Sequence, residues 1–189
     1  MGDIKKIRKK YTKPSHPWRI ARIEEENKIC KEYGIPQKTE IWKAKSKLES
    51  FKNQAKTLSS AHTSQSDMEM KNLLTKLKGY NLIEQDSSDA ILGVTLKNLL
   101  DRRLQTFVYK RGYAKTMKQA RQMITHRHIL VNSKIITSPA YFVKVSDEAA
   151  IEMSPKSPYY SSDHPERAKE ASKRVKKVYT PDNKRKRRR

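Results

Sequence analysis

Residues 112–133, GYAKTMKQARQMITHRHILVNS, decide the fold because the hydrophobic periodicity changes within them. Thr116 and Gln119 have the spacing of a capping box, in which two side chains satisfy free backbone N–H groups at the start of a helix. The apolar residues that follow repeat at helical intervals. From Ile129 they alternate with a period of two, which is typical of a strand, and Asn132-Ser133 predicts a tight turn. The segment therefore predicts one helix that is followed by a small sheet.

A second helix is predicted immediately before this segment. Residues 96–108 carry leucine, phenylalanine and valine at helical spacing on one face, and Gly112 supplies the C-terminal stop. Beyond the turn, residues 135–145 contain alternating apolar side chains with a break at Pro139, which predicts further short strands. A pair of helices packed on a small twisted sheet places this part of the chain in the α+β class.

Three more helices are predicted before residue 90. The first begins at Trp18 and ends at Gly34, a residue type that accepts the left-handed backbone conformation. The second begins with Thr39 as its N-cap and carries the strongest apolar stripe of the chain. The third begins with Ser66 as the N-cap of a capping box. These residues predict a helical domain that precedes the helix pair.

The composition is strongly basic and predicts a polyanionic partner. The 189 residues include 43 Lys+Arg and 20 Asp+Glu, which gives a formal net charge of +23. Self-repulsion at this charge opposes a compact chain unless a polyanion neutralises it. No stretch approaches the roughly 18 consecutive apolar residues of a membrane-spanning helix, and the N-terminus lacks the apolar core of a signal peptide. We therefore expect an intracellular protein that binds nucleic acid rather than a membrane.

Signatures of enzymes, metal sites and cofactor sites are absent from the sequence. The five glycines never cluster, so no P-loop can cradle a phosphate, and no nucleophile-elbow or zinc-protease motif occurs. Cys30 is the single cysteine, which excludes an internal disulfide and favours buried packing. His126 and His128 have no cysteine or acidic residue near them in the sequence, so phosphate contact or a plain surface position is favoured over metal binding. We expect no catalytic residue, no metal and no cofactor.

Two further features favour structural interpretations. Trp18 and Trp42 could stack on nucleobases, but each adjoins an apolar helical stripe, so packing in the core is favoured. The run Glu24-Glu25-Glu26 could suggest a metal site, but acids early in a helix complement the positive end of the helix dipole.

A nucleic-acid interface is predicted on residues 102–128. Within and next to this stretch the cations face only Asp101 as an acid, so the face is not charge-balanced. Arginine donors match phosphate oxygens in pairs, and glutamine and threonine add neutral hydrogen bonds to sugar or phosphate. We predict that Arg121→Glu, at the centre of this face, weakens nucleic-acid binding without unfolding the protein. The candidate nucleic-acid-binding residues are Arg102, Arg103, Lys110, Arg111, Lys115, Lys118, Arg121, Gln122, Thr125, His126, Arg127 and His128.

Both ends of the chain are basic and are expected to be disordered until they meet a partner. The C-terminal run could also resemble a nuclear-localisation signal, and the sequence does not separate this from contact with phosphates. The candidate nucleic-acid-binding residues at the ends are Lys5, Lys6, Arg8, Lys9, Lys10, Lys184, Arg185, Lys186 and Arg187.

The motifs of the basic face resemble the S-four RNA-binding module, a helix pair on a small sheet. The matching runs are Leu100-Asp101-Arg102-Arg103-Leu104-Gln105-Thr106, Gly112-Tyr113-Ala114, Ala120-Arg121, His126-Arg127-His128-Ile129-Leu130-Val131-Asn132 and Pro139. This module also occurs in pseudouridine synthases, tyrosyl-tRNA synthetases and small stress proteins, so by itself it implies only RNA binding. The flanks resemble the small-ribosomal-subunit S-four family in its archaeal and eukaryotic form. The flanking motifs are Lys10-Tyr11, His16-Pro17-Trp18, Glu32-Tyr33-Gly34, Glu40-Ile41-Trp42 and Ser157-Pro158-Tyr159.

The resemblance implies an α+β fold with four parts. These are a basic extension at 1–17, a helical domain at 18–98, an S-four RNA-binding module at 99–152, and a segment at 153–189 that returns to the helical domain and ends in a basic tail. One residue departs from the family pattern. Ser133 stands where the family commonly has glycine, and serine lacks the freedom of glycine at positive φ, so we expect the hairpin to use another turn type.

The resemblance also implies a function without catalysis. A family member is a structural constituent of the small ribosomal subunit that binds rRNA, nucleates assembly of the subunit body and contributes to translational accuracy. The implied partners are small-subunit rRNA, the neighbouring S-five protein, and mRNA at the channel by which it enters. The implied location is the cytoplasm, in the small ribosomal subunit. The alternatives are a stand-alone RNA-binding module of a stress protein or RNA-modifying enzyme, and an architectural protein of DNA.

Overall fold

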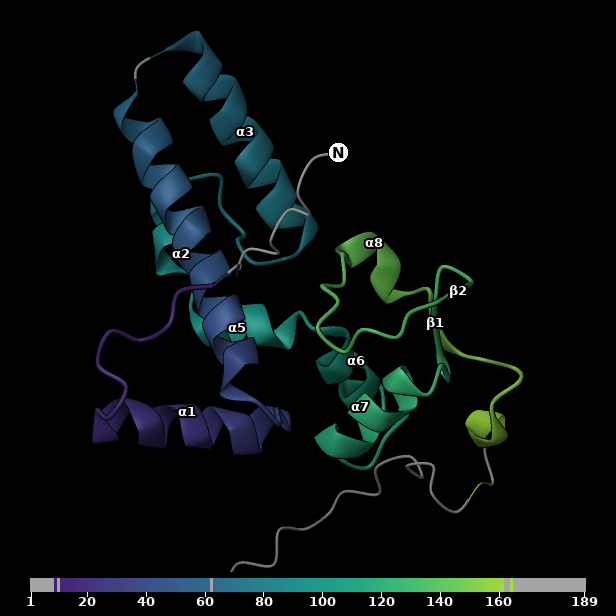
Figure 1. Cartoon of the computed structure of the whole chain (residues 1–189). Helices are drawn as coiled ribbons and strands as arrows, with labels where there is room; N and C mark the ends of the chain where they lie inside the picture. The colour runs from purple at the N-terminus through teal and green to yellow at the C-terminus, as the bar shows by residue number, and fades with distance from the viewer. Residues whose placement is uncertain (1–8, 10, 62, 162–163, 165–189) are drawn as a thin grey trace, which may run out of the picture.

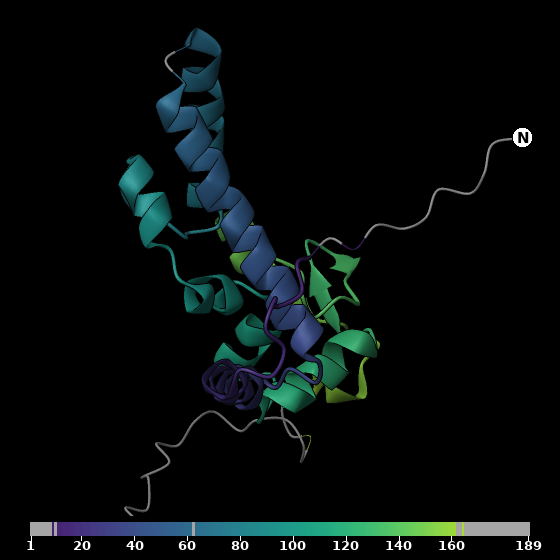
Figure 2. The ribbon, with the colours of Figure 1, turned by 60° about the vertical axis from the view of Figure 1, so that its left-hand side comes forward.

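The computed structural model describes residues 9, 11–61, 63–161 and 164, and it has the expected α+β fold (Figure 1). Five helices form the part that we call the helical body: α1 (Ile20–Tyr33), α2 (Lys38–Ser60), α3 (Ser64–Gly79), α4 (Ser88–Gly93) and α5 (Leu96–Asp101). Figure 2 shows that α2 runs the length of this body, with α3 returning beside it as the other arm of a hairpin. A buried hydrophobic cluster that extends from Tyr33 to Leu100 holds these helices together.

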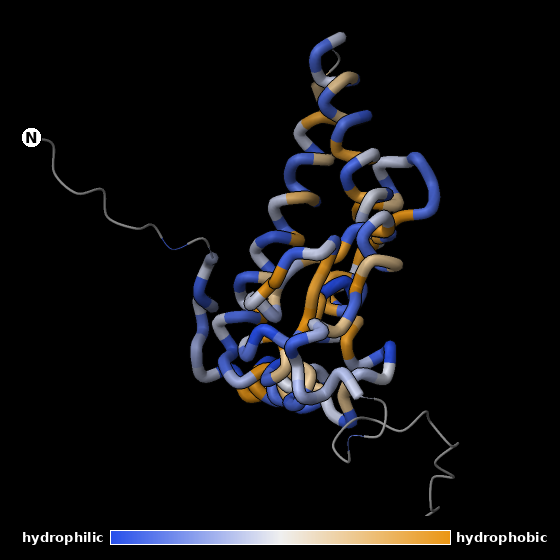
Figure 3. Tube along the Cα trace, turned by 90° about the vertical axis from the view of Figure 1, so that its right-hand side faces the viewer, coloured by the Kyte–Doolittle hydropathy of each residue, from blue (hydrophilic) through white to orange (hydrophobic). Residues whose placement is uncertain are grey.

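The remaining elements form the part that we call the module. They are α6 (Leu104–Lys110), α7 (Met117–Thr125), β1 (Ile129–Val131), β2 (Lys134–Ile135), α8 (Val145–Glu148), β3 (Ile151–Met153) and the 3-10 helix η1 (Pro158–Tyr160). The strands form an antiparallel sheet in the order β2-β1-β3. A second buried cluster, between Leu104 and Ile151, joins α6 and α7 to this sheet. Figure 3 shows the hydrophobic segments gathered where the helices and strands face one another.

The helix starts differ in detail from those expected. Helix α1 ends at Gly34, as predicted, with a φ of 60°. Helix α2 begins at Lys38 and its N-cap is Gln37, so the expectation that Thr39 is the N-cap is wrong. Helix α3 is capped by Thr63, whose side chain accepts a hydrogen bond from the N–H of Ser66, and the Ser66 hydroxyl accepts one from the N–H of Thr63. Ser66 therefore closes the capping box from its third helical position rather than opening it.

The acidic run of α1 has a different role from the one expected. Because α1 begins at Ile20, residues 24–26 lie beyond its first turn and do not cap the helix dipole. Glu26 is buried, and its carboxylate accepts hydrogen bonds from Arg22 at 2.6 Å and from the indole N–H of Trp42 at 3.0 Å. Glu26 thus ties α1 to α2.

Two corrections concern the module. The single helix expected over 96–108 is broken at Arg102 and Arg103, because the backbone there bonds to the segment 139–143 instead of continuing the helical ladder. The N–H of Val143 donates to the carbonyl of Arg102 at 3.0 Å, and residue 103 forms an isolated bridge with residue 142. Residues 141–145 are consequently not a regular strand, and the third strand of the sheet is β3, which the sequence did not predict.

The hairpin turn keeps the geometry that glycine would adopt. Asn132 has a φ of 50° and Ser133 a φ of 61°, and these two residues alone separate the paired residues Val131 and Lys134. Positive φ at both central residues defines a type I′ turn. The expected change of turn type at Ser133 is therefore wrong.

The described part of the C-terminal segment packs on the module. The N–H of Ser154 donates to the carbonyl of His128 at 2.8 Å, and Tyr159 packs against the second hydrophobic cluster. This corrects, for residues 153–161, the expectation that the segment returns to the helical body; most of the remainder lies outside the described residues. No helix in the described ranges is both long and apolar enough to cross a membrane.

Candidate nucleic-acid interface

Helix α7 presents one apolar and one polar side, as its sequence predicts. Thr116 caps the helix by accepting a hydrogen bond from the N–H of Gln119 at 3.1 Å. Ala120, Met123 and Ile124 are buried in the second hydrophobic cluster. Lys118 and Gln122, which lie two residues from Ala120 on either side, are on the solvent side of the helix.

The exposed polar side chains of α7 and its ends form the surface that we call the α7 face. It consists of Lys115, Lys118, Gln122, Thr125, His126 and Arg127. Lys110 and Arg111, at the end of α6, are also exposed, whereas Arg121 and His128 are half-buried. Eight of the twelve residues predicted to bind RNA in this region therefore lie at the surface, and six of them belong to α7 or its ends.

The cations of these surfaces differ in how firmly the protein itself neutralises them. Within the described ranges, Lys118 and Arg127 have no carboxylate within 4 Å. The ammonium of Lys110 lies 3.5 Å from the carboxylate of Asp101, and both side chains are well exposed. Arg111 donates to the backbone carbonyls of Ile151 and Glu148, which fixes its guanidinium without neutralising it. Such a surface attracts phosphate groups.

Arg127 is held in an unusual backbone conformation. Its φ is 65°, the left-handed region in which glycine is the usual residue. The N–H of Arg127 donates to the carbonyl of Ile124, and that of His128 donates to the carbonyl of Met123, so the two bonds form a Schellman motif at the end of α7. An arginine kept at a position that favours glycine is a candidate for function.

The two histidines of this region lie beside each other. The rings of His126 and His128 are nearly parallel with centroids 6.2 Å apart, and His128 also meets the edge of Tyr159. Burial, with the neighbouring His126, lowers the pKa of His128. In the described part of the chain, no group of three or more histidine, cysteine, aspartate or glutamate side chains could hold a metal ion.

Arg102 and Arg103 do not belong to the exposed face. Their side chains are 9% and 4% exposed and pair with Glu148 and Glu40, respectively. Asp101 was expected to be the only acidic residue near these cations. This expectation is wrong, because the carboxylates of Glu148 and Glu40 reach the two arginines from distant positions in the sequence. Arg102 also donates to the backbone carbonyl of Val143 at 3.0 Å. These two cations stabilise the fold instead of facing solvent.

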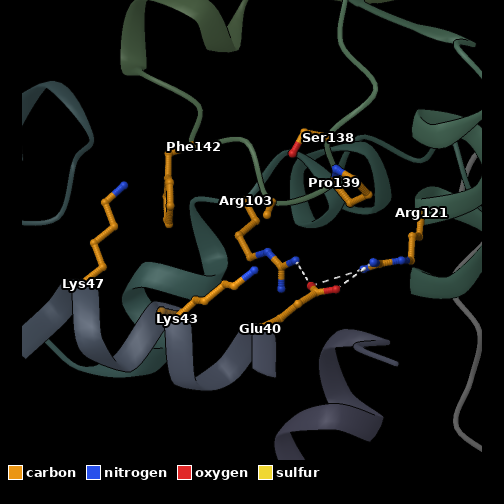
Figure 4. A pocket seen from close by; sticks show the side chains of 10 residues that line it. Glu40, Lys43, Lys47, Arg103, Arg121, Ser138, Pro139 and Phe142 are labelled. Carbon is orange, nitrogen blue, oxygen red and sulfur yellow. Dashed lines mark hydrogen bonds and ion pairs between the residues drawn. The ribbon is translucent and has the colours of Figure 1, made fainter. Parts of the chain in front are cut away.

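Glu40 joins the helical body to α7 and to the residue that precedes α6. Figure 4 shows its carboxylate, on α2, between the guanidinium groups of Arg103 and Arg121. The distances are 2.5 Å to Arg103 and 2.7 Å to Arg121. Burial alone would raise the pKa of Glu40, but the hydrogen bonds from Arg121 and Arg103 outweigh it and hold the pKa below its ordinary value. Arg121→Glu would place a second carboxylate beside Glu40. We therefore expect this substitution to destabilise the fold, contrary to the prediction from the sequence.

Two further contacts fix the module on the body. The side-chain amide of Gln105 donates to the carbonyls of Tyr33 at 3.1 Å and Met117 at 2.8 Å. Gly34 lies so close to the start of α7 that a Cβ there would come within 2.9 Å of the Cβ of Met117. The α7 face is thus oriented by direct contacts with α1 and α2.

A hollow of about 320 Å³ lies beside the Glu40 contact, between α2 and the segment 138–142 (Figure 4). Lys43 and Lys47 line it from α2, and the ammonium of Lys47 lies 3.8 Å from the ring centroid of Phe142. Burial, with repulsion from Lys76, lowers the pKa of Lys47. These lysines could not be predicted from the sequence, because their position beside the module depends on tertiary packing, for which no local spacing gives a signal.

The basic ends fall almost wholly outside the described residues. Lys9 is described and exposed. The residues of the prediction that lie outside the described ranges are Lys5, Lys6, Arg8, Lys10, Lys184, Arg185, Lys186 and Arg187.

Comparison with known proteins agrees with this geometry. The family described as "S4 domain" matches residues 102–148, which span the helix pair and the hairpin. A protein of Methanococcus maripaludis named "Small ribosomal subunit protein uS4" is 47% identical over 169 residues, which cover 88% of this chain and 95% of the relative. A protein of the same name from Methanococcus vannielii is 46% identical over the same shares of the two chains.

Proposed function

The chain belongs to the uS4 family of small ribosomal subunit proteins, and we propose on this premise that it is a structural, non-enzymatic component of that subunit which binds rRNA. The similarity covers 88% of this chain and 95% of the Methanococcus maripaludis relative, so it extends well beyond the S4 domain. The observation that carries the RNA-binding part of the proposal is the α7 face, where Lys118 and Arg127 have no carboxylate within 4 Å in the described ranges.

The α7 face binds the RNA backbone rather than base edges. The major groove of an RNA helix is deep and narrow, so side chains reach phosphates and 2′-hydroxyls more readily than bases. Lys115, Lys118 and Arg127 supply charge for phosphates, and Gln122 supplies neutral hydrogen bonds to sugar or phosphate. The Thr125 hydroxyl already donates within its own helix, to the carbonyls of Arg121 or Gln122, so it acts as an acceptor toward RNA.

The contacts between body and module prepare this face before RNA arrives. Glu40, Gln105 and Gly34 hold α7 against α1 and α2, so little orientational freedom is lost when RNA binds. A face with a fixed shape stabilises one arrangement of the RNA helices that it touches over others. This is how the protein would nucleate assembly of the subunit body.

The finer parts of the proposal come from the family resemblance. They are a role in translational accuracy, contact with the neighbouring S-five protein, contact with mRNA at the channel by which it enters, and location in cytoplasmic small subunits. The large net positive charge, +23, supports a position surrounded by RNA phosphates.

Co-sedimentation tests the proposal as a whole. The tagged protein, expressed in a Methanococcus host, should migrate with the small subunit in a sucrose gradient and should remain there after a high-salt wash. A tagged protein that stays at the top of the gradient, or that moves only with a protein complex free of rRNA, would contradict the proposal.

A further inference from the structure

Trp18 is the most exposed large hydrophobic residue in the described part of the chain. Its side chain is 86% exposed, and Ile20 beside it is 72% exposed. The expectation that Trp18 packs in the core is therefore wrong. The other tryptophan, Trp42, is half-buried and donates its indole N–H to Glu26 at 3.0 Å. Trp18 is therefore an aromatic ring that is accessible to a partner, and tryptophan is enriched at interfaces.

The backbone that carries Trp18 is anchored although its ring is not. The guanidinium of Arg22 donates to the carbonyls of His16 at 3.3 Å and Pro17 at 2.7 Å, and Glu26 holds that guanidinium at 2.6 Å. Upstream, the N–H of Thr12 donates to the hydroxyl of Ser46 at 2.9 Å. The turn is thus held on α1 and α2 while the indole projects into solvent.

The sequence on either side of this indole is basic. Residues 11–19 contain Lys13, His16 and Arg19, all exposed, and no acid. The first acids after Trp18 are Glu24 and Glu25, which are exposed and lie beyond the first turn of α1. An aromatic ring next to cations is the arrangement that binds single-stranded nucleic acid, because the ring stacks on a base while the cations contact the neighbouring phosphates.

We propose that Trp18 stacks on an unpaired nucleobase of the rRNA, as a second RNA contact separate from the α7 face. This inference rests on the proposed function. A nucleobase fits the exposed surface better than a protein does, because a stable protein interface buries about 800 Å² on each partner. Here the exposed apolar surface consists of one indole and one isoleucine.

Intrinsic fluorescence tests the stacking directly, because the chain has only two tryptophans. Small-subunit rRNA of Methanococcus maripaludis is titrated into the full chain and into Trp18→Phe, which retains Trp42 as the only indole. Stacking on a base quenches indole emission, so the full chain should lose fluorescence on binding and Trp18→Phe should lose almost none. Equal quenching of the two proteins would overturn the inference.

Filter binding with the same rRNA supplies the second readout. Trp18→Ala should bind about tenfold more weakly, Trp18→Phe should retain most of the affinity, and Ile20→Ala should bind as the full chain does. Full affinity of Trp18→Ala would overturn the inference. If Trp18→Ala failed only to enter the assembled subunit while binding naked rRNA normally, the indole would contact a protein and the inference would also fail. No binding of rRNA by the unaltered chain would instead contradict the proposed function itself.

Discussion

At the scale of single residues, Glu40 is the side chain on which the arrangement of body and module most depends. Its carboxylate accepts hydrogen bonds from Arg103, which directly precedes α6, and from Arg121 on α7. The Arg103 side chain is 4% exposed, so water cannot replace a missing carboxylate. Removal of one member of such a group leaves a desolvated charge, which costs more than the intact group contributes.

We expect Glu40→Gln to lower the free energy of unfolding by about 2–3 kcal/mol, because Arg103 and Arg121 lose their counter-charge. Denaturant unfolding at neutral pH measures this change. The exposed pair of Lys78 and Asp86 is the matched control, and Asp86→Asn should change stability by less than about 1 kcal/mol. Equal effects of the two substitutions would show that the burial of the ion pairs of Glu40 does not increase their contribution to stability.

The contribution of Glu40 should also depend on pH. Its pKa is lower in the folded protein than its ordinary value, since the hydrogen bonds from the arginines outweigh burial. A carboxyl of this kind stabilises the fold above its unfolded pKa and loses that effect as pH falls through its folded pKa. The difference in stability between the wild type and Glu40→Gln should therefore shrink below about pH 4. A difference that stays constant down to strongly acidic pH would rule out charge as its cause.

Arg127 has a left-handed backbone conformation, which residues other than glycine rarely adopt. We expect Arg127→Gly to raise the free energy of unfolding by about 0.5–1 kcal/mol, because glycine adopts a φ of 65° without strain. The same variant should bind rRNA more weakly, since the α7 face then has one cation fewer. Thermal unfolding and filter binding measure the two effects. Arg127→Ala should weaken binding without the gain in stability, and a gain in stability with unchanged binding would remove Arg127 from the interface.

At the scale of helices and strands, the elements that could be predicted from the sequence are those that depend on the spacing of neighbouring residues. Helix α7 with its Thr116 cap, and the strand that follows it, were expected and are found, because capping and periodicity are properties of neighbouring residues. The break between α5 and α6 could not be predicted in this way. It arises from backbone bonds to residues 139–143, which lie far along the chain.

The same distinction explains the outcome for the candidate site. The exposure of Lys118 and Gln122 follows from the periodicity of α7 alone. The burial of Arg102 and Arg103 does not, because their carboxylate partners are 46 and 63 residues away in the sequence. An excess of basic residues in a segment therefore overstates the charge that faces solvent.

The contact between α1 and α7 depends on the absence of a side chain at Gly34. We expect Gly34→Ala to lower the free energy of unfolding by about 2–3 kcal/mol, because its φ is 60° and its Cβ would lie 2.9 Å from that of Met117. Denaturant unfolding measures the decrease. Gly79→Ala, where no atom lies within 4 Å of the added Cβ, should instead be neutral or stabilising by up to about 1 kcal/mol. A neutral Gly34→Ala would mean that α1 and α7 are not packed as closely as described.

At the scale of the whole molecule, the basic residues that give the net charge of +23 have two different roles. Arg102, Arg103 and Arg121 form ion pairs that hold the helical body and the module together. Other cations, such as Lys118 and Arg127, have no carboxylate within 4 Å among the described residues and are available to a polyanion. The first group gives the second a fixed orientation, so stability and binding depend on different basic residues.

The most direct test of RNA binding by the α7 face is filter binding to small-subunit rRNA over a range of salt concentrations. Lys118→Glu is compared with Lys71→Glu, which makes the same change of charge at an exposed position on α3. Lys118→Glu should weaken binding and reduce the slope of log affinity against log salt by about 0.7–0.9 for each phosphate that the variant no longer neutralises. Lys71→Glu should bind as the wild type does. Equal weakening by the two substitutions, or unchanged binding of Lys118→Glu, would contradict the account.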